Sequence, residues 1–185
     1  MSLARAYLTL ALVVASLLGG CAKSRDACAD KDNRPVGTAL LAFLSRSRAA
    51  HHRADAREER NDPRGAEVEL AAIVDGPVPP CPSAAEVREV LADTRARLGD
   101  LKSRHGDFPG ALADVEKGLT LVPDEGYFRG HLVEVRGLVE ERHAKALAAS
   151  GDLPGSKAAE DRALSAFQEA MRIQSAVIER AAPKP

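Results

Sequence analysis

Apolar residues recur every three to four positions through most of this 185-residue chain, which is the spacing of an amphipathic helix. Turn residues rich in Pro, Gly and Asp interrupt the pattern, and Val and Ile are too scattered to indicate strands. Short connections favour antiparallel neighbours, so the pattern predicts an all-α fold of three helix pairs. The six helices are expected at about 35–59, 63–74, 83–105, 109–122, 125–150 and 156–181.

Particular residues predict where these helices begin. Ser83 and Glu86 have the spacing of a capping box, which predicts the start of the third helix. Four prolines within residues 77–82 hold the chain extended before it, because Pro lacks a backbone donor. The segment 151–155, GDLPG, predicts a turn, so that Ser156 begins the last helix.

The same spacing predicts which side chains are buried. Leu41, Val68, Met171 and Ile178 fall on the apolar stripes of their helices, so we expect them to face the core. Aromatic residues make up only 3% of the chain, which has no Trp, while Ala and Leu dominate. Close packing of alanines must therefore provide much of the burial.

The N-terminus resembles an export signal. An apolar run, YLTLALVVASLL, follows Arg5; at about a dozen residues it is shorter than the ~20 that a membrane-spanning helix needs. The sequence Leu18-Gly19-Gly20-Cys21 resembles the bacterial lipobox. The resemblance implies that residues 1–20 are a lipoprotein signal peptide, removed before Cys21, whose thiol and new amino group are acylated. The alternatives are a plain signal peptide with an incidental cysteine, or an uncleaved anchor.

The lipobox resemblance also implies a location. Ala22 follows the cysteine, where inner-membrane lipoproteins often have Asp, so the resemblance implies outer-membrane sorting and a protein that faces the periplasm. Several acyl chains on one residue are enough for stable attachment. We therefore expect a lipidated tether at 21–34, a helical domain at 35–182 and a disordered tail at 183–185.

Two further cysteines, Cys28 and Cys81, remain if Cys21 is lipidated. The periplasm is oxidising, so one leftover pair predicts a disulfide between them. Closing this loop stabilises the fold by about 4 kcal/mol in the ideal case. The alternative is two free thiols that lie too far apart to bond. A zinc site is not indicated, because no Cys-x-x-Cys pair is present.

Residues 97–123, RLGDLKSRHGDFPGALADVEKGLTLVP, resemble one tetratricopeptide repeat (TPR), a 34-residue helix–turn–helix unit. The matching positions are Leu98-Gly99, Gly106-Asp107-Phe108, Ala111, Leu119 and Pro123, while Val115 replaces a usual aromatic residue and Gly118 a usual Ala. Arg95 and Lys102 stand where the family often has aromatic residues. The resemblance implies stacked antiparallel helical hairpins, a TPR-like solenoid. The alternative is a plain antiparallel bundle with one coincidental motif.

Two weaker copies flank this repeat. One contains Asp62, Ala66 and Leu70, and the other contains Ala163 and Phe167. If Ala66, Ala111 and Ala163 are equivalent, the copies are 45 and 52 residues apart rather than 34. We therefore expect lengthened first helices or loops.

The TPR resemblance implies a binding groove lined by the first helix of each hairpin. In the best repeat the groove positions fall on Asp93, Ala96, Asp100, Ser103 and Arg104. In the next pair they fall on Tyr127, Gly130, Glu134, Gly137 and Leu138. The alternative is that the charged members form only a solvated helix surface.

Composition and motifs narrow the class of function. With 26 basic and 27 acidic side chains, the chain lacks the basic excess of a nucleic-acid-binding protein. No nucleophile elbow or phosphate-binding loop is present, so we predict neither an enzyme nor a cofactor site. His51, His52 and Asp55 could ligate a metal ion, but no third ligand stands at a familiar spacing, and we predict no metal site.

These expectations combine into one hypothesis. The chain is expected to be a lipid-anchored envelope protein that binds another protein or a peptide, an adaptor of the kind that serves outer-membrane or pilus and secretion assembly. The alternative is a structural envelope lipoprotein, a helical spacer with no dedicated partner. A substrate-binding lipoprotein of a transporter is poorly supported, because such proteins are larger and rich in strands.

Overall fold

The computed structural model describes residues 37–79 and 84–182. The chain divides into two units, Met1–Pro35 and Val36–Pro185, and the description below concerns the second unit. The predicted signal peptide, tether and tail, and with them Cys21, Cys28 and Cys81, lie outside the described residues. So does Ser83 of the predicted capping box.

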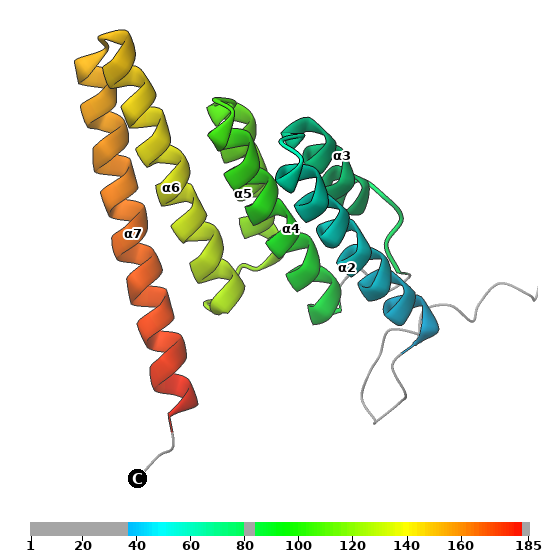
Figure 1. Ribbon diagram of the computed structural model, residues 1–185. Coiled ribbons are helices and arrows are strands. Elements are labelled where there is room, and N and C mark those ends of the chain that lie inside the picture. Colours follow the sequence, from blue (N-terminus) through cyan, green and yellow to red (C-terminus); the bar gives the residue numbers. More distant parts are fainter. Residues whose placement is uncertain (1–36, 80–83, 183–185) are drawn as a thin grey trace, which may run out of the picture. The chain divides into compact units, whose positions relative to one another are not determined.

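The described residues form six α-helices and no strand, so the all-α prediction is confirmed (Figure 1). The helices are α2 (Thr38–Glu59), α3 (Pro63–Val74), α4 (Ala85–Arg104), α5 (Phe108–Leu121), α6 (Tyr127–Ser150) and α7 (Leu153–Ala181). Within the described part of the chain, no helix is both long and apolar enough to span a membrane.

The helices pack as three hairpins in chain order. Helix α2 packs on α3, α4 on α5, and α6 on α7. Helix α4 also contacts α2, α3 and α6, and α5 contacts α6. The three first helices, α2, α4 and α6, are therefore neighbours along one face, whereas the second helices do not contact each other among the described residues.

The three hairpin turns repeat with a period of 45 residues. An aspartate at each turn caps the second helix by accepting a hydrogen bond from a backbone N–H three residues later, at 2.9 Å. The caps are Asp62, Asp107 and Asp152, and the donors are Gly65, Gly110 and Gly155. The residue before each cap has positive φ, which favours Gly or Asn. These residues are Asn61, Gly106 and Gly151, with φ of 58°, 84° and 88°.

This period corrects two predictions about the last hairpin. The predicted turn at 151–155 is shorter, because Asp152 caps the helix and Pro154 fits its first turn, so α7 begins at Leu153 rather than Ser156. The residue equivalent to Ala66 and Ala111 is then Ser156, not Ala163, and both intervals are 45 residues. At the third helix, α4 begins at Ala85 with Ala84 at the N-cap and no side-chain cap.

Alanine is the most frequent residue among the buried hydrophobic side chains of the described chain, as its composition predicts. Helices α4 and α5 also approach closely at Gly99, where an added Cβ would lie 2.9 Å from a side-chain atom of Val115. The Leu98-Gly99 pair of the best repeat therefore serves the contact between α4 and α5.

Four predicted core residues are exposed instead. Leu41 is 53% exposed, and Val68, Met171 and Ile178 are each about 70% exposed. All four lie on the first or last hairpin, where no further hairpin of the described chain covers the outer face. In the middle hairpin the corresponding faces are covered on both sides, so a helical stripe alone overestimates burial at the two ends.

Candidate functional site

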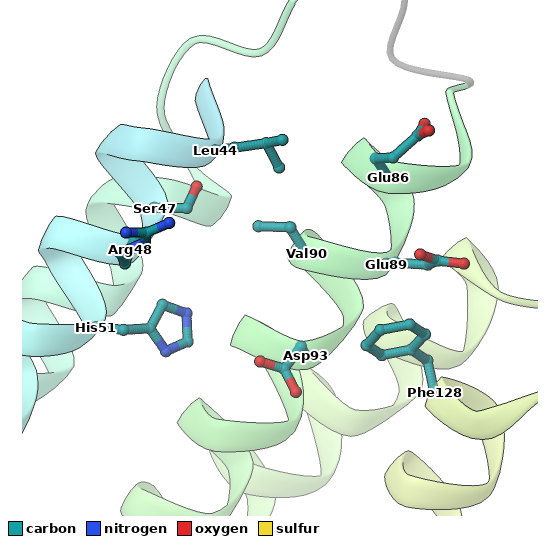
Figure 2. A pocket seen from close by; sticks show the side chains of 9 residues that line it. All are labelled: Leu44, Ser47, Arg48, His51, Glu86, Glu89, Val90, Asp93 and Phe128. Atoms are coloured by element: carbon teal, nitrogen blue, oxygen red, sulfur yellow. The ribbon is translucent and has the colours of Figure 1, made fainter. Parts of the chain in front are cut away.

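The face formed by α2, α4 and α6 contains an open cleft of about 490 Å³ (Figure 2). Nine residues from the three helices line it: Leu44, Ser47, Arg48, His51, Glu86, Glu89, Val90, Asp93 and Phe128. The volume lies within the usual range of ligand-binding clefts. The cleft exists only because the three hairpins stack, since each helix contributes part of its lining.

The cleft combines an apolar floor with charged walls. Leu44 of α2, Val90 of α4 and Phe128 of α6 provide the apolar surface. Glu86, Glu89 and Asp93 follow one another on α4 at helical spacing, and Arg48 lies across from them on α2; the walls therefore carry three negative charges and one positive charge.

None of these four charged side chains forms an ion pair with any residue that the structure describes. The nineteen ion pairs within that part of the chain involve neither Arg48 nor the three cleft carboxylates. The acidic wall of the cleft is therefore not neutralised from within the described chain.

Ser47 is a second unsatisfied group in the cleft. Its side chain is only 3% exposed, and its hydroxyl has no hydrogen-bond partner. It lines the α2 wall between Leu44 and Arg48 (Figure 2). A buried hydroxyl without a partner costs free energy, and the Ser47 oxygen is closed to solvent.

His51 lies at one end of the cleft (Figure 2). Its hydrogen bonds are those of a neutral imidazole. Its Nε2 lies 3.0 Å from the Thr94 hydroxyl, which itself donates to the Val90 carbonyl, so Nε2 is the donor. Its Nδ1 accepts from Arg97 at 3.3 Å. Burial, together with the charge of Arg97, lowers the pKa of His51 from its ordinary value.

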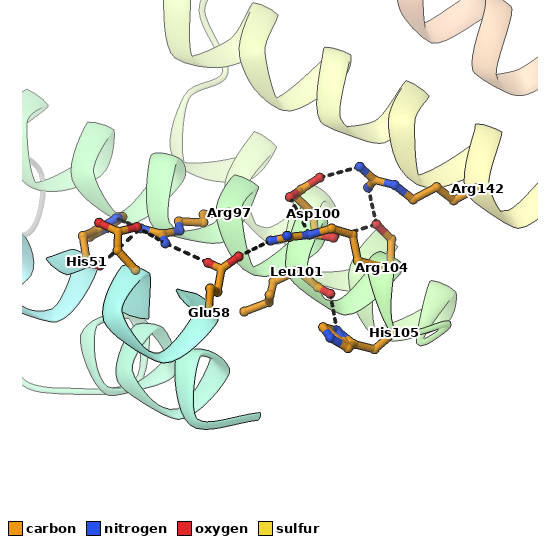
Figure 3. Close-up of polar contacts among 10 residues, drawn as sticks. His51, Glu58, Arg97, Asp100, Leu101, Arg104, His105 and Arg142 are labelled. Atoms are coloured by element: carbon orange, nitrogen blue, oxygen red, sulfur yellow. Dashed lines mark hydrogen bonds and ion pairs between the residues drawn. The ribbon is translucent and has the colours of Figure 1, made fainter. Parts of the chain in front are cut away.

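Further along the same face lies an ion-pair network that connects the three first helices (Figure 3). We use this name for Asp55 and Glu58 of α2, Arg97, Asp100, Ser103 and Arg104 of α4, and Arg142 of α6. It contains three positive and three negative side chains, so it is neutral overall.

On one side, the network joins α2 to α4. A single Arg97 nitrogen lies 2.5 Å from Asp55 and 2.8 Å from Glu58, and Arg104 contacts the other oxygen of Glu58 at 2.5 Å. Burial opposes ionisation of Glu58, but hydrogen bonds from both arginines hold its pKa below the usual value.

On the other side, the network joins α4 to α6. Arg142 lies 2.9 Å from Asp100 and donates to the Ser103 hydroxyl at 2.6 Å. Asp100 also pairs with Arg104 at 3.2 Å. Each charge in the network thus has a partner on a neighbouring helix or one turn away, which stabilises the stacking of the hairpins.

The six charged or polar groove residues expected from the sequence separate into three groups. Asp93 lines the cleft. Asp100, Ser103 and Arg104 belong to the ion-pair network. Tyr127 and Glu134 are exposed on α6 and lie outside the cleft and the network, but Tyr127 lines a smaller hollow that adjoins the cleft. Whether any of the six binds a partner stays a prediction.

Three small residues assigned to the groove are buried instead. Ala96 is fully buried. Gly130 and Gly137 face α7, where an added Cβ would lie 2.7 Å from Gln174 and 2.6 Å from Phe167. These glycines allow close packing within the last hairpin, so the interpretation of all three as groove residues is corrected.

Sequence reasoning missed most of the cleft, although the 45-residue period contains the necessary signal. Arg48 lies one period, 45 residues, before Asp93, and Glu89 lies one period before Glu134. The same step from Asp100 and Ser103 gives the network residues, Asp55 and Glu58. The groove positions had been assigned only on the second and third hairpins, so the residues of α2 were not found.

Within the described residues, no group of three His, Cys, Asp or Glu side chains is placed to hold a metal ion. His51 uses both ring nitrogens in protein hydrogen bonds, and Asp55 pairs with Arg97. Two members of the sequence set, His51 and Asp55, are therefore already engaged within the protein, whereas His52 is exposed.

No family model matches this chain, and no curated protein and no solved structure matches it either. Function is therefore inferred from the residues and their geometry.

Proposed function

We propose that this protein is a lipid-anchored interaction protein of the bacterial cell envelope, which binds a partner protein or peptide in the cleft between α2, α4 and α6. The cleft carries the proposal, because it exposes an apolar floor beside three carboxylates that have no ion-pair partner among the described residues. We further propose a non-enzymatic role, as an adaptor in outer-membrane, pilus or secretion assembly.

The proposed arrangement of the domain is a short TPR-like solenoid. It is supported by the order of the hairpins, by the contacts between successive first helices, and by the capped turns at 45-residue intervals. Solenoids present such first-helix faces to extended segments of other proteins. The proposed anchor is supported by the lipobox-like sequence Leu18-Gly19-Gly20-Cys21.

The test is a cross-linked capture of the lipidated protein from membranes. The native chain is compared with Glu89→Lys/Asp93→Lys in the cleft and with Glu160→Lys/Glu179→Lys on the exposed surface of α7, which changes the net charge equally. We expect one envelope protein to be recovered with the native chain and the α7 variant, and lost with the cleft variant. Equal recovery with all three would remove the cleft as a binding site.

The alternative is a helical spacer without a dedicated partner. One observation favours it: Asp100 and Arg104, two expected groove residues, are paired within the protein and serve the stacking of the hairpins. Recovery of the same weakly bound proteins with the native chain and both variants would support the spacer role.

A further inference from the structure

The cleft carries chemical information about what it binds. Its floor is apolar, with Leu44, Val90 and Phe128 contributed by three different helices. An apolar side chain inserted there would lose water contact against all three residues, which favours binding. The open cleft is therefore suited to a segment that carries at least one apolar side chain.

Its charge favours a cation beside that side chain. Glu86, Glu89 and Asp93 stand on one face of α4, whereas acidic residues of the ion-pair network, such as Asp100, are bonded to arginines. The only cation among the cleft residues is Arg48, since His51 is held neutral by its hydrogen bonds. A positively charged ligand would complement this wall, and an anionic one would be repelled.

Ser47 adds an unsatisfied polar group to the opposite wall of the cleft. The acidic wall belongs to α4, but Ser47 belongs to α2, and its buried hydroxyl lacks any partner in the described chain. A peptide N–H or C=O group can satisfy this hydroxyl only if Ser47 or its neighbours shift, because the oxygen is closed to solvent.

The length of the hollow favours a peptide over a single small amine. A second hollow of about 240 Å³ adjoins the cleft and shares Glu89 and Phe128 with it. It continues over the connection between α5 and α6, along residues 121–126, and its lining includes both acidic residues and the cations Arg88 and Arg129. A segment of several residues can occupy both hollows.

We infer that the cleft binds a cationic peptide segment of a partner protein. One apolar side chain lies on the floor formed by Leu44, Val90 and Phe128, and flanking Lys or Arg side chains lie against Glu89 and Asp93. This inference rests on the proposed function, because it names the chemistry of the partner that the cleft accepts.

The experiment measures peptide binding to the purified full chain by fluorescence anisotropy. The probes are labelled Lys-Leu-Lys-Lys-Leu-Lys, its acidic counterpart Glu-Leu-Glu-Glu-Leu-Glu, and Lys-Ser-Lys-Lys-Ser-Lys, which lacks the apolar side chains. We expect the Lys-Leu peptide to bind, the acidic peptide not to bind, and the Lys-Ser peptide to bind at least about tenfold more weakly because the floor stays exposed.

The protein variants are the same as in the membrane capture. Like charges placed together across an interface are strongly unfavourable, so Glu89→Lys/Asp93→Lys should weaken Lys-Leu binding at least about tenfold. Glu160→Lys/Glu179→Lys should leave it unchanged. If the charge-reversed cleft variant fails to fold, Glu89→Gln/Asp93→Asn replaces it, since these side chains keep the shape and lose the charge.

Three results would overturn the inference: no binding of the Lys-Leu peptide, equal weakening by the α7 variant, or tighter binding of the acidic peptide. Each can be separated from failure of the proposed function. A partner captured from membranes and lost with the cleft variant, together with no Lys-Leu binding, leaves the interaction function standing and rejects only the cationic chemistry. A partner recovered equally with all chains rejects the interaction function itself.

Discussion

Both halves of the exposed face of α4 carry charged side chains, but only one half pairs them with other described residues. Toward the C-terminal end, Arg97, Asp100 and Arg104 are all bonded to charges on neighbouring helices or one turn away. Toward the N-terminal end, Glu86 and Glu89 have no ion-pair partner among the described residues. The difference lies in what faces them, and it shows that the charge of a helix surface does not by itself identify a binding site.

The facing residues explain the difference. At the C-terminal end, α2 and α6 present Glu58 and Arg142, which complete the pairs. At the N-terminal end, the same two helices present Leu44 and Phe128, which cannot pair with a carboxylate, and Arg48, which forms no ion pair within the described chain. One half of the face therefore holds the hairpins together, while the other is left available for a ligand.

The largest expected effect is on stability and separates the two halves directly. Arg97→Ala removes the contacts to Asp55, Glu58 and His51, so we expect a loss of about 2 kcal/mol, between the values for surface and buried pairs. Arg48→Ala, in the cleft, removes no ion pair with the described chain and should change stability by less than about 0.5 kcal/mol. Urea unfolding measures both, and equal losses would contradict the comparison.

A cation introduced into the cleft should pair with its carboxylates and compete with a cationic ligand. Leu44→Arg places a cation opposite Glu86 and Glu89 and removes part of the apolar floor. We expect at least about tenfold weaker binding of the Lys-Leu peptide, or about 1.4 kcal/mol. Anisotropy titration measures it, with Leu41→Arg as the control, since Leu41 is exposed outside the cleft. Unchanged affinity in Leu44→Arg would show that the peptide binds elsewhere.

Ionic strength should affect the two halves unequally. The Debye length falls from about 10 Å at 0.1 M salt to about 3 Å at 1 M, and charges that remain in solvent are screened most. Raising salt over this range should weaken Lys-Leu binding several-fold while the melting temperature changes little, because the network pairs are in direct contact. A larger salt effect on unfolding than on binding would reverse the assignment.

The smallest expected effect is a pH dependence at the boundary between the halves. Burial, and then Arg97, lowers the pKa of His51 in the folded chain, so the unfolded chain binds the proton more readily. Stability is therefore lost as pH falls through 6.5 toward the lowered pKa, and solvent screening keeps this loss small. Unfolding between pH 7.5 and 5.0 should be flatter in His51→Asn, and identical slopes would exclude this role.

Much of the fold could be predicted from the sequence, because helix periodicity and capping residues act locally. The helix expected at 63–74 has these bounds in the structure, and the helix expected from residue 109 begins one residue earlier, at Phe108. The start of α7 was missed, although Asp152 and Gly155 repeat the same cap, because the turn was interpreted from Gly and Pro content alone. Exposure of Met171 could not be predicted, since a helical stripe does not reveal whether another helix covers it.

The site was harder to predict for a physical reason. Asp93 was found from a repeat pattern within α4, but its neighbours Arg48 and Phe128 come from other helices and meet it only through the stacking register. Which charged residues form ion pairs also depends on how the helices are stacked. The sequence could therefore not distinguish Asp100, which is bonded to Arg142, from Glu89, which has no such partner.

The central claim is that the unpaired half of this face contacts a partner, and site-specific photo-cross-linking in cells tests it most directly. A photoreactive phenylalanine analogue is placed at Arg48 on the cleft wall or, as a control, at Glu160 on the exposed surface of α7. The account predicts a discrete cross-linked protein from position 48 that is absent from position 160 and lost when Glu89→Lys/Asp93→Lys is added. No cross-link at position 48, or the same products from both positions, would contradict it.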